Sequence, residues 1–491
     1  MPPHNTIVCR QRRRKSADPL ARRRRGHYSA STGAAALLVA GAPVDRHNPP
    51  VERRFAVSHR LVLGIAVPMM IAYLTTPLIG VVDTAVVGQF GDAALIGGLA
   101  AGAIVFDLVF ATFNFLRSGT TGLVAQAMGR GDALEEQAVF WRALALAVVA
   151  GVVLALLSPL FILAGIWFLD AEPRVNEAMA TYIGIRILAA PFALANYAIL
   201  GYVLGRGEAG LGLALQVVLN GTNVALSILF GLEFGWQIAG VAWGTVCGEI
   251  VAAIVGMAIL YPRFRRNPRP TLQRIGAVDS LLRMLALNRD IMIRSFALLA
   301  AFALFARQGA QFGTTTLAAN AVLMNFFLVG GYFLDGFATA AEQLAGRAIG
   351  ARDRTAFSRA VLLSTGWGFV LAVVTTLLFL FFGGHFIALV TTAADVRTEA
   401  QTYLPWAAFT AISGLLAFAM DGVYIGATWS RDMRNMMLAS FAVFWAALAI
   451  LSARFGNHGL WAALHLFLLV RGFSLLAIVP ARTRSTFRIL R

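Results

Sequence analysis

Some ionisable side chains of this chain stand inside long apolar runs, where a charge is costly. The stretch PLIGVVDTAVVGQFGD, residues 77–92, places Asp83 among apolar residues. A charged residue at the centre of a membrane helix costs about 2.5–3.5 kcal/mol on insertion scales. A carboxylate that is kept there can take up a proton or bind a cation and so lose its net charge. Asp83 is therefore a candidate for a site that takes up a proton or a cation.

Further polar side chains occupy similar runs and predict a cavity lined by acids that binds a proton or an organic cation. Asp335 and Glu342 are seven residues apart, and Asn223 and Ser227 are four apart, so each pair shares one face of a helix. The other candidates for the substrate cavity are Asp107, Asn114, Asn220 and Asp421, with Glu249 as a further acid inside a span.

A structural interpretation of these residues is also open. The acids could cap bent helices, or they could pair with one another and with arginines inside or near the spans. The available cations are Arg117, Arg186 and Arg307.

The composition places these residues in a membrane. Of 491 residues, 58% are hydrophobic and 13% are charged, and the mean hydropathy is +0.72. A soluble globular protein has about 25% charged residues. The two cysteines, Cys9 and Cys247, lie in a polar and an apolar segment, which argues against a disulfide. The sequence shows no metal or redox motif, so we expect no cofactor besides the coupling ion.

Breaks at charges, glycines and prolines divide the chain into twelve candidate spans, each at or above the roughly 20 residues that cross a bilayer. They lie near residues 61–90, 94–127, 138–168, 176–205, 209–232, 237–261, 283–311, 316–347, 359–390, 398–427, 434–454 and 459–480. Every connection after an even-numbered span carries arginine, whereas those after odd-numbered spans hold three arginines in all. The positive-inside rule then places both termini in the cytoplasm.

The first part of the chain is strongly basic. Residues 1–54 hold twelve basic and three acidic residues. We expect residues 1–58 to be a disordered cytoplasmic tail, or an over-long predicted start, whose arginines can touch anionic lipid headgroups. Nothing else in the sequence favours binding to nucleic acid.

The chain is internally duplicated. Seven identities recur at a constant offset of 221 residues, among them Gly129 with Gly350 and Asp132 with Asp353. Six spans per copy make the repeats parallel, with the substrate site near their interface. We expect an all-α membrane protein with a first six-helix lobe at 59–262, a cytoplasmic linker at 263–282, a second lobe at 283–480 and a cytoplasmic tail at 481–491.

Several ordered motifs resemble the multidrug and toxic compound extrusion family, and its DNA-damage-inducible protein F branch in particular. They include PLIGVVDTAVVGQFGDAALIGGLAAG, FNFLRSGTTGLVAQAMGRGD, ALANYAILGYVLG, YFLDGFATAAEQLAGRAIGARD and DGVYIGATWSRDMRN, and the similarity covers about residues 60–480. The resemblance implies a V-shaped bundle of two six-helix lobes and cation-coupled efflux. It also implies a coupling site at Asp83, Asn196 and Asn223. Where many members have a second acid four residues after the last asparagine, this chain has Ser227, so Asp83 is expected to act without that acid.

The resulting hypothesis is a monomeric antiporter, driven by protons or alternatively by sodium, that exports amphipathic cationic drugs or toxic metabolites across a bacterial inner membrane. A flippase for lipid-linked precursors of the same superfamily is the first alternative. Its cavity would hold arginines for pyrophosphate, whereas the charges inside the spans of this chain are interpreted as mostly acidic. An intramembrane enzyme is the second alternative, although only His465 among the seven histidines is clearly inside a span.

Overall fold

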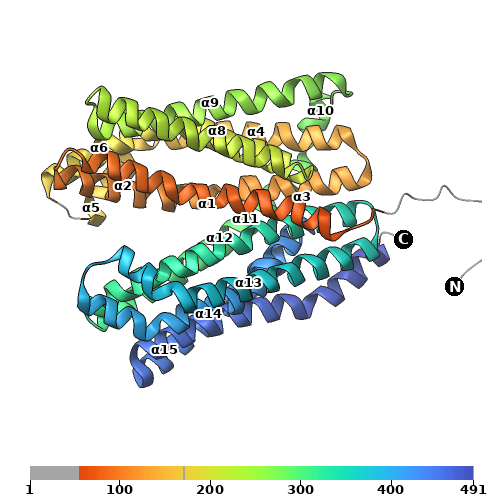
Figure 1. The fold of residues 1–491 in the computed structure, drawn as a ribbon. Coiled ribbons are helices and arrows are strands. Elements are labelled where there is room, and N and C mark those ends of the chain that lie inside the picture. The colour runs from red at the N-terminus through yellow and green to blue at the C-terminus, as the bar shows by residue number, and fades with distance from the viewer. Residues whose placement is uncertain (1–54, 170–171, 490–491) are drawn as a thin grey trace, which may run out of the picture. The chain divides into compact units, whose positions relative to one another are not determined.

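The computed structural model describes residues 55–169 and 172–489, and the regular structure in these ranges is helical (Figure 1). The basic tail expected at residues 1–58 lies outside the described residues except for 55–58. The first half of the chain forms α1 (His59–Gly88), α2 (Ala93–Phe113), α3 (Phe115–Arg130), α4 (Ala133–Leu156), α5 (Ser158–Leu169), α6 (Pro173–Arg186), α7 (Ala190–Gly205), α8 (Ala209–Ile228), α9 (Gln237–Arg266) and α10 (Leu272–Ile275). The second half forms α11 (Val278–Gln311), α12 (Thr314–Gly350), α13 (Arg354–Val390), α14 (Ala394–Gly426) and α15 (Ser430–Ile489).

The described residues form the twelve spans that were expected. Ten helical segments of the described chain are long and apolar enough to cross a membrane. One of them, α15, consists of two helices that meet at Gly456, where φ is 55°. Phe444 and Phe467, on either side of this turn, pack ring to ring at 5.5 Å, so the two helices run side by side. The twelfth span is α11, which is 34 residues long but is interrupted by arginines and other polar residues.

Three of the spans are interrupted, one of them at the candidate Asn114 and another next to Arg186. Asn114 separates α2 from α3, and Leu157 separates α4 from α5. A short 3-10 turn, Ile187–Ala189, joins α6 to α7 just before Pro191. Proline fits the first turn of a helix because its missing N–H has no helical partner there. Asn114 and Arg186 therefore stand at helix junctions.

The duplication is visible in equivalent contacts of the two halves. Asp132 caps α4 and Asp353 caps α13, each by accepting a hydrogen bond from the amide three residues later, at 3.0 and 2.9 Å. Gly201 of α7 packs against the backbone of α3, and Gly422 of α14 packs against the backbone of α12 at the position 221 residues later. The two halves therefore share one helix-packing pattern.

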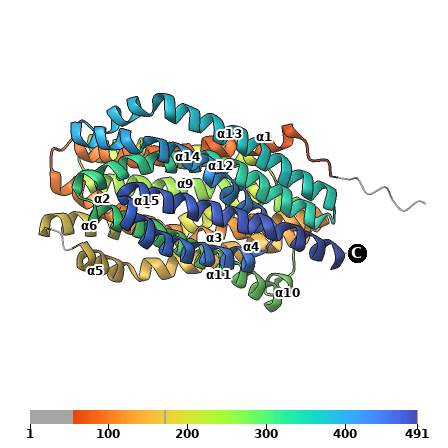
Figure 2. The same cartoon turned by 90° about the horizontal axis from the view of Figure 1, so that it is seen from below.

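The halves meet through α1 and α3, which pack against α12, and α3 also contacts α11 and α14. Close contacts lie at one end of the bundle, which we call the basic end and which holds the connections 131–132, 206–208, 267–277, 351–353 and 427–429. There a Cβ on Gly350 would lie 2.1 Å from the Gln126 carbonyl oxygen, and the Gln126 Nε2 donates to the Gly426 carbonyl at 2.9 Å. Figure 2 shows α10 at this end, set off from the long helices near α4 and α11.

An ionic contact ties the 206–208 connection of the basic end to the last turns of α9. The Glu208 carboxylate pairs with Arg263 and with Arg206. Burial alone would raise the pKa of Glu208, but the hydrogen bonds and charges of the two arginines outweigh it and lower the pKa below its usual 4.5. This carboxylate is therefore stabilised in its charged form.

Large apolar side chains face outward from several helices. Leu156 and Phe381 are each 75% exposed, and Leu389 is 84% exposed. Such a surface would aggregate in water, but it suits a hydrocarbon environment, in which helices satisfy their own backbone hydrogen bonds. The burial pattern therefore agrees with lipid around the bundle.

Candidate functional site

The Asp83 side chain is buried in the first half, near the end of α1. It is 5% exposed, and its Oδ1 has no hydrogen-bond partner among the described residues. Ser227 of α8 lies beside the carboxylate, and the charge of Arg186 from α6 also acts on it. Asp83 forms no ion pair within 4 Å in the described part of the chain. It is thus a buried acid whose charge is only partly compensated.

A short polar chain continues from Asp83 across α8 to α9. The Ser227 hydroxyl lies 3.5 Å from the Asn223 Oδ1, and the Asn223 Nδ2 donates to the Thr245 Oγ1 at 2.9 Å. Gly244 of α9 permits this approach, because a Cβ there would lie 2.7 Å from the Ser227 Oγ. Asn223 and Ser227 are buried, so the chain is sheltered from bulk solvent.

Asn220, the third polar residue of α8, ties that helix to α1. Its Nδ2 donates to the Thr75 Oγ1 at 2.6 Å, and its Oδ1 accepts from Gln216 at 3.2 Å. Thr75 lies two residues before Pro77, where α1 lacks a backbone donor. Asn220 therefore contacts α1 before Pro77 in the sequence, whereas Asp83 lies after Pro77.

Asn196 belongs to a second cluster, around Arg186. Its Nδ2 donates to the Glu249 Oε2 at 2.7 Å and to the Glu249 carbonyl at 2.9 Å, joining α7 to α9. The Arg186 guanidinium lies 4.6 Å from the Phe106 ring centroid, and its charge acts on Asp83, Asp107 and Glu249. One arginine thus faces three carboxylates in the first half.

Asp107 and Asn114 belong to the α2 span, and Asp107 lies toward the second half. Both side chains are exposed. The charge of Asp107 acts on Tyr332 of α12, which belongs to the other half. The Asn114 Oδ1 accepts a hydrogen bond from the Arg117 Nε at 3.1 Å.

Arg117 of α3 links the two halves through polar side chains. Its Nη1 donates to the Tyr73 hydroxyl at 3.1 Å, and that hydroxyl lies 3.0 Å from the Thr339 Oγ1 of α12. Asp335 and Glu342, on the same face of α12, act on the Arg117 charge. Glu342 is 3% exposed and its Oε1 has no hydrogen-bond partner among the described residues.

Asp421 of α14 is held by two arginines. Its Oδ2 accepts from Arg294 of α11 and from Arg471 of α15, and all three side chains are largely buried. The charges of the same two arginines act on Asp335. A series of charged side chains therefore extends from Arg117 of α3 through Asp335 of α12 to Arg471 of α15.

Two arginines of this network were missed by the sequence analysis. Arg294 and Arg471 are the partners of Asp421, whereas Arg307 is exposed. With Arg117 and Arg186, four arginines lie among the six candidate acids, so the charges inside the spans are more mixed than the sequence analysis assumed. Arg471 stands alone in the run LFLLVRGFSLLAIV, the same signal that drew attention to Asp83, and it could have been found in this way.

The described residues include no group of three or more His, Cys, Asp and Glu side chains that could hold a metal ion. The polar groups of the two halves therefore offer carboxylates, amides, hydroxyls and guanidinium groups to a ligand.

Comparison with known proteins agrees with this architecture. The MatE family model matches twice, at residues 68–229 and 291–451. The chain is 35% identical to the DNA damage-inducible protein F of Escherichia coli over 86% of this chain and 92% of the relative. It is 28% identical to a probable multidrug resistance protein NorM of Deinococcus radiodurans, over 87% of this chain and 96% of the relative.

A solved structure shares the fold. It is a MOP superfamily transporter from Pyrococcus furiosus, for which a binding pocket of reverse polarity suggests a different function. The TM-score is 0.80 at 16% sequence identity, over 87% of this chain and 96% of that one. Because the family model matches most of the chain, the intramembrane enzyme considered above is excluded: the chain belongs to the multidrug and toxic compound extrusion (MATE) family of secondary transporters, multi-pass membrane proteins of multidrug efflux.

Proposed function

We propose that this transporter is a proton-coupled antiporter of the bacterial inner membrane, with both termini in the cytoplasm, that exports amphipathic organic cations by alternating access. The observation that carries the proposal is the Asp83 carboxylate, which is buried, has an unpartnered oxygen and forms no ion pair in the described part of the chain. A second carboxylate four residues after Asn223 is replaced by Ser227, so Asp83 is the acid of this polar chain.

The coupling step follows from the cost of burying a charge. An isolated ionised carboxylate is unfavourable in an apolar interior, and a proton removes that charge. Protonation of Asp83 would weaken its attraction to Arg186. The helix α1, which contains two prolines, could then repack against α8. One charge that crosses a potential of 100 mV supplies about 2.3 kcal/mol, which is enough to bias a two-state equilibrium.

The amides support this step rather than carry the proton. Asn223 holds Ser227 and Thr245 in one chain, and Asn196 holds Glu249. An amide does not titrate, so Asn196 and Asn223 would hold α7 and α8 against α9 in either protonation state. Sodium is the alternative ion, because the carboxylate, hydroxyl and amide oxygens around Asp83 are hard ligands.

The substrate would bind between the halves, near Asp107 and Asn114 of the first half and Asp335 and Glu342 of the second. Asp335 and Glu342 each feel the charge of Arg117, so a bound cation would compete with that arginine for the acids. Asp421 already pairs with two arginines, and we assign it to the wall that holds α11, α14 and α15 together.

The test is efflux of a cationic dye by purified Asp83→Asn in proteoliposomes under an imposed pH gradient, at matched protein levels. The amide keeps the shape and the hydrogen-bonding capacity of the acid, but it cannot ionise. We expect normal folding, retained dye binding and loss of gradient-driven efflux. Asp395→Asn, which changes an exposed acid in the first turn of α14, is the control and should transport normally.

The same vesicles then receive a sodium gradient at constant pH. Efflux driven by the sodium gradient alone would show that the coupling ion is sodium and not a proton. Near-normal, pH-dependent efflux by Asp83→Asn would remove Asp83 as the coupling site and turn attention to Asp335 and Glu342.

A flippase for lipid-linked precursors is a second candidate, because four arginines lie among the buried acids. Arg294 and Arg471 are committed to Asp421, however, and Arg117 to Tyr73 and Asn114. A pyrophosphate would have to displace these partners. Reconstituted protein that moves a fluorescent pyrophosphate-linked lipid between leaflets, but not a cationic dye, would favour the flippase.

A further inference from the structure

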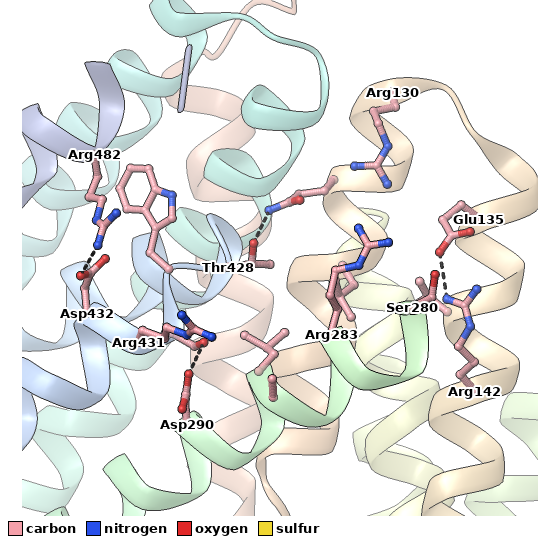
Figure 3. A pocket seen from close by; sticks show the side chains of 17 residues that line it. Arg130, Glu135, Arg142, Ser280, Arg283, Asp290, Thr428, Arg431, Asp432 and Arg482 are labelled. Carbon is pink, nitrogen blue, oxygen red and sulfur yellow. Dashed lines mark hydrogen bonds and ion pairs between the residues drawn. The ribbon is translucent and has the colours of Figure 1, made fainter. Parts of the chain in front are cut away.

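A pocket with a volume of about 450 Å³ opens at the basic end, away from the acids assigned to coupling and substrate binding (Figure 3). The ends of α3 and α4 form the part of its wall that belongs to the first half. The start of α11 and the turn between α14 and α15 form the part that belongs to the second half. Sites for small ligands have volumes of about 300–1,000 Å³, so the pocket is large enough for one.

The acids that line this pocket already have partners. Glu135 pairs with Arg142 at 2.8 Å, and Asp432 pairs with Arg482 at 2.6 Å. Asp290 accepts from the Arg434 Nη1 at 2.7 Å and from the Ser430 hydroxyl at 2.9 Å. The acidic charge of the lining is therefore balanced by arginines next to it.

Three further arginines of the lining have no acidic partner within 4 Å in the described part of the chain: Arg130, Arg283 and Arg431. All three side chains are exposed. In Figure 3 the guanidinium groups of Arg130 and Arg283 extend toward each other, and Arg431 lies across the pocket from them. Like charges that converge on one cavity repel each other unless an anion lies between them. Guanidinium groups match the oxygens of phosphate in charge and in geometry.

We propose that this pocket binds a phosphate-bearing anion, supplied either by the headgroup of an anionic phospholipid or by a soluble phosphorylated molecule. Arg130 comes from α3, whereas Arg283 and Arg431 come from α11 and α15, so the bound anion links the two halves. If the halves rock apart at this end during transport, which rests on the proposed alternating access, the anion stabilises the closed arrangement seen here.

Binding is measured on the purified full-length protein in two arms. Calorimetry with glycerol 3-phosphate tests the soluble source. Native mass spectrometry of delipidated protein, with phosphatidylglycerol compared with phosphatidylcholine, tests the lipid source. The variant R130Q/R283Q/R431Q should weaken binding by about tenfold or more in the arm that shows it, because charge-assisted hydrogen bonds to the phosphate are lost.

The matched control is R265Q/R266Q/R269Q, which removes the same number of exposed charges from the basic end but lies outside the pocket lining. This control should change the dissociation constant by less than about twofold, because it alters only the general electrostatic attraction of the anion. Melting temperatures without the anion check that both variants fold, and lysine variants at the three pocket positions should keep part of the affinity.

If binding is seen in one of the two arms and not in the other, that result identifies the source of the phosphate as the lipid headgroup or the soluble molecule. An equal loss in the two glutamine variants, or no binding of either probe to the wild type, would overturn the proposal. Neither readout requires transport, so a failure here is distinct from a failure of the proposed antiport.

Discussion

Replacing Asp421 by asparagine tests whether the buried charge network holds the second half together. In the structure the Asp421 carboxylate is the shared partner of Arg294 and Arg471, whose side chains are 17% and 3% exposed. The substitution keeps the size of the side chain but removes its charge. Two guanidinium groups would then be buried side by side without the acid that separates them.

The magnitude follows from the burial. Two opposite charges 4 Å apart attract with about 4 kcal/mol at an effective dielectric constant of 20. Breaking a buried ion pair by removing one partner costs about 3–5 kcal/mol, because the remaining charge is left uncompensated. We expect a loss of this size for Asp421→Asn. For Asp83→Asn we expect a change within about 1 kcal/mol, because no arginine is left without an ion-pair partner there.

The assay is equilibrium unfolding in mixed micelles, followed by tryptophan fluorescence, for both variants and the wild type. A second variant, Asp421→Asn with Arg471→Gln, removes one uncompensated charge and should recover about 2 kcal/mol relative to Asp421→Asn alone. Equal stability losses for Asp421→Asn and Asp83→Asn, or no recovery in the double variant, would show that the network does not contribute as argued.

Three other predictions concern the basic end and the orientation of the chain. Gly350→Ala should destabilise the protein by about 1–3 kcal/mol, because its Cβ would overlap the α3 backbone, whereas Gly366→Ala in open space on α13 should be neutral or slightly stabilising in the same assay. Glu208→Gln should lower the unfolding free energy by up to about 1 kcal/mol at pH 7. Because the folded pKa of Glu208 is depressed, this contribution is present above pH 4.5 and disappears as the pH falls through the folded value, so wild-type and variant melting curves should converge in acid. Arg266→Cys and Asp395→Cys should react with impermeant thiol reagents from opposite sides of the membrane, with position 266 cytoplasmic; labelling of both from one side would contradict the twelve-span orientation.

The elements of the fold could be predicted from the sequence because they depend on local patterns. Apolar length defines the spans, and a repeated glycine or aspartate at a fixed offset reveals the duplication. Asp132 and Asp353 illustrate this point, since each caps the helix that follows it and needs no distant partner. The turn at Gly456 was predicted in the same way, because it lies in the connection between the expected spans 434–454 and 459–480.

The partners of the candidate site could not be predicted in the same way, because they lie on helices that are distant in sequence. Asn196 was grouped with Asp83 by resemblance, yet its side chain pairs with Glu249 of α9. Asp421 receives Arg294 from 127 residues before it and Arg471 from 50 residues after it. Only the packing of α11, α14 and α15 brings these charges together.

The contact between Gly129 and Gly350 has a consequence for the origin of the chain. A Cβ on either glycine would lie 2.9 Å from the Cα of the other, so the contact is reciprocal, and the two positions are equivalent in the duplicated sequence. A residue that meets its own equivalent is the mark of an isologous, two-fold interface. An ancestral protein half as long would therefore have formed this contact as a homodimer, with one glycine touching its own copy. Fusion of the two genes would then have let the two halves diverge in sequence. Asp83 of the first half and Asp421 of the second could therefore acquire different partners.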